Sequence, residues 1–218
     1  MKKYKIKVDT NYPVAFDSPD HQFPVGTKND NYTKPEFIED IESLFNYNRL
    51  NFMDLGCSGG LLVHDLVRRG HIAVGLEGSD YSLYHGRAEW PVLYQRNLFT
   101  CDISKPFHVM IIKDDEPEAP FLCDVISAWE VVEHIHPNEL LPFFENIRKH
   151  LKINGIFLAS ISLAEMPPLH QSVFSAKHWF ENILSKLPGF RLCLYPFDPT
   201  RAVRFYRNSI YICLQRID

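Results

Sequence analysis

NFMDLGCSGG, residues 51–60, decides the fold together with IAVGLEGSD, residues 72–80. An apolar strand ends in an acid, breaks into a glycine-rich turn and continues into an amphipathic helix. A second apolar strand follows and ends at Glu77, 21 residues after Gly56. Such a β–α–β unit forms a nucleoside-binding crevice at the carboxyl ends of parallel strands.

The same alternation of strand and helix patterns continues along the chain. It predicts a helix from Pro35, strands at residues 98–103 and 123–129, a helix at 138–151 and a fifth strand after Gly155. Residues 108–120 are expected to be an insertion with a short strand and an acidic turn. A helix capped by Ser175 and a final pair of strands close the chain. The pattern sums to five β–α repeats, a helix and a β-pair, which is an α/β, doubly wound, Rossmann-like sheet of seven strands, mostly parallel with an antiparallel last strand.

Residues 1–34 differ in composition from residues 35–218, which we expect to form the main domain. They are rich in Asn, Asp, Pro and Thr and carry several turn signals. Two interpretations stay open: a partly ordered surface arm, or a lid over the crevice. In a lid, the polar contacts would come from His21, Lys28, Asn29 and Asp30.

Composition limits the classes of partner. With 45% hydrophobic residues in 218, the chain can bury a substantial core, and its net charge of −4 makes nucleic acid an improbable partner. The nearby Arg201, Arg204 and Arg207 are expected to lie in a solvated turn. Five cysteines without metal-binding spacing and the lack of a secretory leader predict a cytoplasmic protein. No apolar run is long enough to span a membrane. The sequence leaves the oligomeric state open.

The turn does not fit a phosphate-binding loop. Its glycine spacing does not complete the dinucleotide fingerprint, and no Lys follows to meet a phosphate. Asp54, at the end of the strand, would repel a phosphate but suits the amine of an amino acid. A ligand with an amino-acid tail, a ribose and an adenine fits better.

At this point the chain resembles the class I S-adenosylmethionine-dependent methyltransferases. DLGCSGG is similar to their D/E-x-G-x-G-x-G motif, with Ser58 in place of the middle glycine. The resemblance implies S-adenosylmethionine as cofactor, with Asp54 near its amine, Glu77 on the ribose and Asp102 on the adenine. The full set implied for the cofactor is Asp54, Gly56, Cys57, Ser58, Gly60, Glu77, Gly78, Asp102, Ile103, Trp129 and Glu130.

The histidines after the fourth strand are the candidates for catalysis. His134, in EVVEHIHP, is the best candidate base for an oxygen acceptor, although a packing or capping role is the alternative. Glu133 could orient its imidazole, His136 is a weaker candidate base, and His170 could approach from the loop after the fifth strand. We assign no metal ligand on this interpretation.

Three functions stay open. The first is O-methylation of a sugar, glycan or other small polar acceptor, a choice that a loose likeness of the N-terminal segment to methyltransferases encoded with surface-glycan genes favours. The second is metal-dependent RNA 2′-O-methylation, because Glu130, Glu133, His134 and His170 resemble the metal site of small-RNA methyltransferases. The same string also occurs in ubiquinone-pathway O-methyltransferases. The third is a non-enzymatic module that binds the cofactor.

Overall fold

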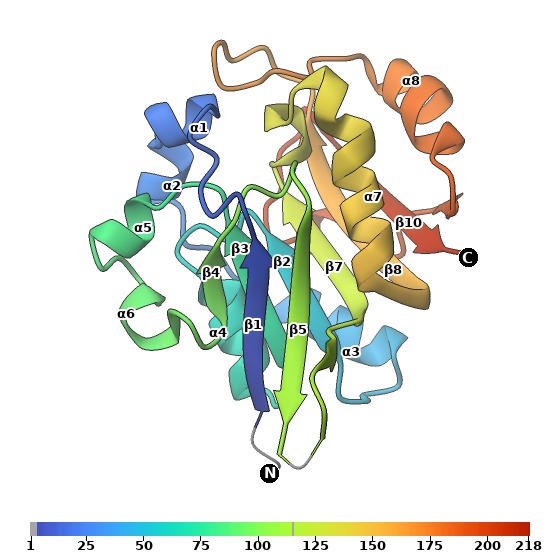
Figure 1. Ribbon diagram of the computed structural model, residues 1–218. Coiled ribbons are helices and arrows are strands. Elements are labelled where there is room, and N and C mark those ends of the chain that lie inside the picture. The colour runs from blue at the N-terminus through green and yellow to red at the C-terminus, as the bar shows by residue number, and fades with distance from the viewer. Residues whose placement is uncertain (1–3, 115) are drawn as a thin grey trace.

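A computed structural model describes residues 4–114 and 116–218. Its main sheet has seven strands in the order β4-β3-β2-β7-β8-β10-β9, which confirms the predicted fold (Figure 1). The first five strands run parallel, and β10 is antiparallel to both of its neighbours. The strands are β2 (Asn51–Leu55), β3 (Ile72–Glu77), β4 (Leu98–Thr100), β7 (Cys123–Trp129), β8 (Leu151–Ser162), β9 (Phe190–Cys193) and β10 (Ser209–Arg216).

Helices cover both faces of this sheet, and each face has its own apolar core. Neighbouring residues of β2 show the division, since Phe52 packs with α3 and α4 whereas Met53 packs with α7. Among the described residues, no helix is both long and apolar enough to cross a membrane. The helices are α1 (Pro19–Gln22), α2 (Val25–Asn29), α3 (Pro35–Leu44), α4 (Leu61–Arg68), α5 (Tyr81–Tyr84), α6 (Trp90–Leu93), α7 (Leu140–His150) and α8 (Ala176–His178), the last capped by Ser175 as predicted.

A second sheet, which the sequence did not predict, joins the N-terminal arm to the insertion expected at residues 108–120. The N-terminal arm begins as a strand, β1 (Tyr4–Thr10), which pairs antiparallel with β5 (Phe107–Lys113), and β5 pairs in turn with β6 (Ala119–Pro120). In the chain, β5 and β6 lie between β4 and β7, where the third β–α repeat would need a helix. The alternation in YKIKV explains the strand, because Ile6 is buried in the core while Lys5 and Lys7 face solvent.

His150, at the end of α7, connects the second sheet to that helix. Its Nδ1 donates to the carbonyl of Asn146 (2.8 Å), and its Nε2 accepts from the amide of Val109 in β5 (3.2 Å). Its ring stacks on Phe107 with 4.6 Å between ring centroids. Burial lowers the pKa of His150 from 6.5 to about 4. The folded protein therefore contains His150 as the neutral imidazole.

This lowered pKa predicts a pH-dependent loss of stability. Between pH 6.5 and about 4 the unfolded chain binds a proton at His150 that the folded chain does not, so the unfolding free energy falls as the pH falls. At about 1.4 kcal/mol per pKa unit, the loss from this group is roughly 3 kcal/mol at most. Denaturant unfolding of His150→Gln should show a smaller decrease across this range than the parent. His178→Gln, which alters an exposed histidine on α8, should keep the full decrease. Equal slopes in both variants would contradict the assignment.

Candidate active site

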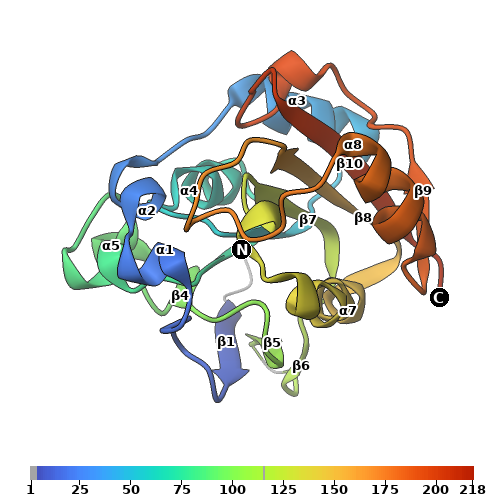
Figure 2. The same ribbon diagram turned by 90° about the horizontal axis from the view of Figure 1, so that it is seen from above.

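A cavity of about 1030 Å³ opens at the carboxyl ends of the parallel strands. The turns after β2, β3, β4 and β7 form its floor, α1 and α2 of the arm cover one side, and residues 163–171 border the other (Figure 2). Predicted site residues on its wall are Gly56, Ser58, Glu77, Gly78, Asp102, Ile103, Trp129, Glu130, His134, His136 and His170. One cavity therefore brings together most of the expected cofactor and catalytic side chains.

Glu77 and the glycine-rich turn are joined by a direct hydrogen bond. The amide of Ser58 donates to Oε2 of Glu77 over 2.7 Å, and the amide of Ser79 donates to Oε1 over 3.2 Å. Ser58 itself has a φ of +48°, so the serine takes the left-handed conformation that a glycine would take in the family motif. Burial raises the pKa of Glu77, while these backbone hydrogen bonds oppose the rise. The carboxylate is held at the strand end and faces the cavity.

Asp102 and Glu130 complete the polar wall near these turns. Asp102 lies just beyond β4, and its Oδ1 accepts from the amide (3.0 Å) and the hydroxyl (2.7 Å) of Ser104. Glu130, with a φ of +56°, accepts from the hydroxyl of Ser209 over 3.1 Å. The ends of three strands, β3, β4 and β7, thus present a carboxylate to one cavity.

Three of the predicted cofactor residues lie behind the wall rather than on it. Asp54 is 4% exposed and accepts a hydrogen bond of 2.6 Å from Ser127, and its burial is the main reason why its pKa rises to about 7. Cys57 and Gly60 are also absent from the cavity lining and are buried. Asp54 therefore lies behind the cavity wall, with Ser127 as its hydrogen-bond partner.

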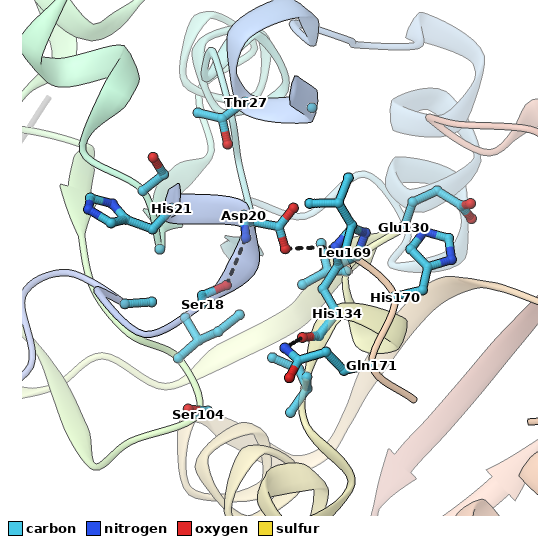
Figure 3. Close-up of a pocket in the computed structure, with 18 of the residues that line it drawn as sticks. Ser18, Asp20, His21, Thr27, Ser104, Glu130, His134, Leu169, His170 and Gln171 are labelled. Atoms are coloured by element: carbon cyan, nitrogen blue, oxygen red, sulfur yellow. Dashed lines mark hydrogen bonds and ion pairs between the residues drawn. The ribbon is translucent and has the colours of Figure 1, made fainter. Parts of the chain in front are cut away.

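His134 lies in a short 3₁₀ turn, Val132–His134, directly after β7. Its Nδ1 is 2.7 Å from Oδ2 of Asp20 in α1, and Figure 3 shows these two side chains pointing toward each other. Burial alone would lower the pKa of His134, but Asp20, assisted by Glu133 and Glu130, raises it above its ordinary value. The carboxylate that contacts the imidazole is thus Asp20, whereas the sequence had suggested Glu133.

His170 approaches from the loop after β8, as expected. The rings of His134 and His170 lie edge to face with 4.8 Å between centroids, and Nδ1 of His170 donates to the carbonyl of Ala164 (2.6 Å). Burial lowers the pKa of His170. His136 instead caps the next turn, because its Nδ1 accepts from the amide of Asn138 over 3.3 Å.

Glu133 is the one fully buried acid beside these histidines. Neither of its carboxylate oxygens has a well-formed hydrogen bond within the described residues, and burial raises its pKa to about 8. One ligand atom each from Glu133, His134 and His170 fall within 4.8 Å of one another. An orphaned carboxylate beside two imidazoles fits a divalent cation, so these three residues could hold one.

The arm is seated on the glycine-rich turn by contacts that the sequence did not indicate. The hydroxyl of Ser58 donates to the carbonyl of Asp30 (2.7 Å) and accepts from Arg87 (2.9 Å). Oδ1 of Asn31 accepts from the amide of Leu61 over 3.0 Å, at the start of α4. A Cβ on Gly59 would meet Asn31 at 2.3 Å, so glycine is required there for the arm to approach.

The arginines near the C-terminus also bind this region. Arg204 pairs with Asp30 and lies over the ring of Tyr32, and Arg201 pairs with Asp40 of α3 (2.6 Å). The expected solvated turn is therefore wrong for Arg204, whose partly buried cation neutralises an acid of the arm, whereas Arg201 makes its ion pair at the surface. Of the other arm residues singled out from the sequence, His21 lies 3.7 Å from Asp80, Asn29 bonds to Val25 in its own helix, and Lys28 is exposed outside the cavity lining.

Comparisons with known proteins give matches over most of the chain. A family model described as a methyltransferase domain matches residues 30–206. The ubiquinone biosynthesis O-methyltransferase of Rhizobium etli (strain CIAT 652) is 30% identical over 145 residues, which are 64% of this chain and 50% of that protein. The chain spans about half the length of the curated relatives it matches.

Solved structures show the same fold at low identity. A TehB-like SAM-dependent methyltransferase from Corynebacterium glutamicum is 14% identical with a TM-score of 0.56, covering 90% of this chain and 94% of its own. The 1,6-didemethyltoxoflavin-N1-methyltransferase of Burkholderia thailandensis is also 14% identical, with a TM-score of 0.54 over 91% and 84% of the two chains.

The glycine-rich turn predicts a pair of contrasting substitutions. Gly60 and Gly70 both have left-handed backbones, with φ of +90° and +96°, but a Cβ on Gly60 would meet buried Leu98 at 2.5 Å whereas one on Gly70 meets nothing. Gly70→Ala should therefore cost about 1–2 kcal/mol of unfolding free energy from backbone strain alone. Gly60→Ala should cost roughly 1–3 kcal/mol more because the core must shift. Equal losses in denaturant unfolding would contradict the close packing of this turn.

Proposed function

Because this chain belongs to the methyltransferase domain family and takes S-adenosylmethionine as its cofactor, we propose that it methylates a hydroxyl of a small polar acceptor, with His134 as the base. The observation that carries this proposal is the single cavity that holds Glu77 and Asp102 together with His134. The cofactor site and the base thus lie in the same cavity, as the transfer of a methyl group between two bound molecules requires.

The protein contributes to this reaction mainly by positioning the acceptor hydroxyl against the methyl group of the cofactor. A hydroxyl oxygen attacks the methyl carbon in line with the sulfur, the C–S bond breaks as the C–O bond forms, and S-adenosylhomocysteine leaves as a neutral thioether. The hydroxyl proton must leave during this step. His134 can accept it at Nε2, since Nδ1 faces Asp20.

Within the donor site, Glu77 would accept from both ribose hydroxyls and Asp102 from the adenine amino group. Gly56, Ser58, Gly78, Ile103, Trp129 and Glu130 would supply the remaining wall. Asp54 would act from behind the wall by holding Ser127, and Cys57 and Gly60 would shape the turn.

The acceptor is proposed to be a hydroxylated small molecule. The curated relatives are named ubiquinone biosynthesis O-methyltransferases, which supports oxygen as the methylated atom. Polar groups from Ser18, Asn138 and Gln171 line the cavity beside the aromatic rings of Phe16 and Tyr206. Such a mixture suits a sugar hydroxyl or a phenol, and a glycan acceptor stays our first candidate with a phenol second.

A metal-assisted reaction is the second candidate, because Glu133 is buried without a well-formed hydrogen bond beside His134 and His170. A divalent ion held there would acidify and orient the acceptor hydroxyl. RNA as its substrate is less well supported, since the cavity wall carries several carboxylates while Arg201 and Arg204 are paired with Asp40 and Asp30. A module that binds the cofactor without transferring its methyl group is the third.

The ribose assignment predicts a loss of cofactor affinity. Glu77→Ala should weaken binding of S-adenosylhomocysteine by about 2 kcal/mol or more, because hydrogen bonds to a charged group are each worth roughly 1.5–3 kcal/mol. Calorimetric titration measures this directly. Glu116→Ala, which removes an acid on the distant side of the second sheet, is the matched control and should leave the affinity unchanged. An unchanged affinity in Glu77→Ala would contradict the assignment of Glu77 to the ribose.

The base assignment predicts a selective loss of turnover. His134→Gln should lower kcat about 10²- to 10⁴-fold, the usual contribution of general-base catalysis, with S-adenosylhomocysteine affinity within twofold. Transfer of labelled methyl to nucleotide-sugars, catechols and RNA fragments both identifies the acceptor and supplies the rate. His136→Gln should change kcat far less, and the reverse order would move the base to His136.

Chelation separates the first two candidates. Activity that survives a strong chelator and does not fall in His170→Ala would remove the metal-assisted reaction. Loss of activity in chelator, restored by a divalent cation and abolished in Glu133→Ala, would establish it. Cofactor binding with no labelled product from any acceptor class would favour the third candidate.

A further inference from the structure

The N-terminal arm carries a residue into the candidate active site that no comparison assigns. Asp20 lies in the second helical position of α1, where Ser18 caps the helix by accepting from the amide of Asp20 (3.2 Å) and Pro19 occupies the first position. Ser18, Pro19 and Asp20 therefore set a short rigid turn. That turn aims the carboxylate of Asp20 into the cavity (Figure 3).

The segment that carries Asp20 is held on both sides by contacts with the donor site. Before it, the amide of Ala15 donates to the carbonyl of Gly78, over 2.9 Å, next to Glu77. After it, the carbonyl of Asp30 accepts from the hydroxyl of Ser58 on the glycine-rich turn. The same parts of the chain that would hold the cofactor thus fix both ends of the segment that spans the cavity.

On the opposite wall, His134 is fixed through its backbone. The amide nitrogen of the Gln171 side chain donates to the carbonyl of His134 over 2.7 Å, and the backbone amide of Gln171 donates to the carbonyl of Glu133 over 2.8 Å. These bonds locate the main chain of His134 but leave its ring to be set by side-chain contacts. The 2.7 Å contact of Nδ1 with Asp20 is one such side-chain contact.

We propose that Asp20 is the positioning residue for His134: it holds the proton on Nδ1 and turns Nε2 into the nitrogen that faces the acceptor. This inference rests on the proposed role of His134 as the base. The consequence is that the base is complete only when the arm is seated on the glycine-rich turn. A carboxylate at Nδ1 would also orient His134 if its other nitrogen held a metal ion, so the assignment does not choose between the two mechanisms.

The test reads the imidazole directly and needs no acceptor. Nitrogen-15 spectra of the S-adenosylhomocysteine-bound protein, recorded at a pH where His134 is neutral, show which ring nitrogen carries the proton. His134→Gln identifies the signal among the ten histidines. The parent should hold the proton on Nδ1, and Asp20→Ala should move most of the population to the Nε2-protonated form that free imidazole side chains prefer. Asp9→Asn, which removes an exposed acid of the same arm outside the cavity, should leave the spectrum unchanged.

Turnover on the acceptor found by the labelled-methyl screen gives the second readout. Asp20→Ala should lower kcat about ten- to a hundredfold while S-adenosylhomocysteine affinity changes less than twofold, and Asp20→Glu should recover part of the loss. A weaker cofactor affinity with kcat unchanged would make Asp20 an anchor of the arm and overturn the proposal, as would an unchanged His134 tautomer in Asp20→Ala. A tautomer that depends on Asp20 in a protein that transfers no methyl group would keep the pairing and reject the proposed function.

Discussion

The hydrogen bond from the amide of Ser58 to Glu77 is the interaction on which the rest of the site depends. It joins the turn after β2 to the end of β3 and thereby sets the distance between the two parts of the donor site. Ser58 can make it because its backbone takes the left-handed conformation, with a φ of +48°. The side chain that replaces the family's middle glycine bonds to the arm through its hydroxyl.

The glycine-rich turn also connects the arm to the side of the cavity that carries His134. Ser58 and Arg87 hold the carbonyl of Asp30, and Arg204 from the C-terminal loop pairs with the Asp30 carboxylate. Residues from three distant parts of the chain therefore meet at one position of the arm. Because the arm also carries Asp20, the geometry at His134 is tied to the geometry of the cofactor turn.

Much of the fold could be predicted because its signals are local. The acid–glycine turn after Phe52 and Met53, the apolar strands and the cap at Ser175 each lie within about ten residues, and the family, fold and cofactor inferred from them are confirmed. The second sheet could not be predicted with the same rules. The alternation in YKIKV is a local signal for β1, but its partner strand lies about 100 residues later, so no neighbouring turn indicates the pairing.

The sequence by itself determined which side chains lie at the ends of the parallel strands, because neighbouring residues encode both the length of a strand and the turn that follows it. Glu77 and Asp102 face the cavity for this reason, and His134 follows its strand directly. Only the tertiary structure decided that Asp54 lies behind the wall, that Glu133 is buried without a well-formed hydrogen bond, and that Asp20 contacts His134. Those outcomes depend on contacts between segments as far as 114 residues apart, which no local periodicity encodes.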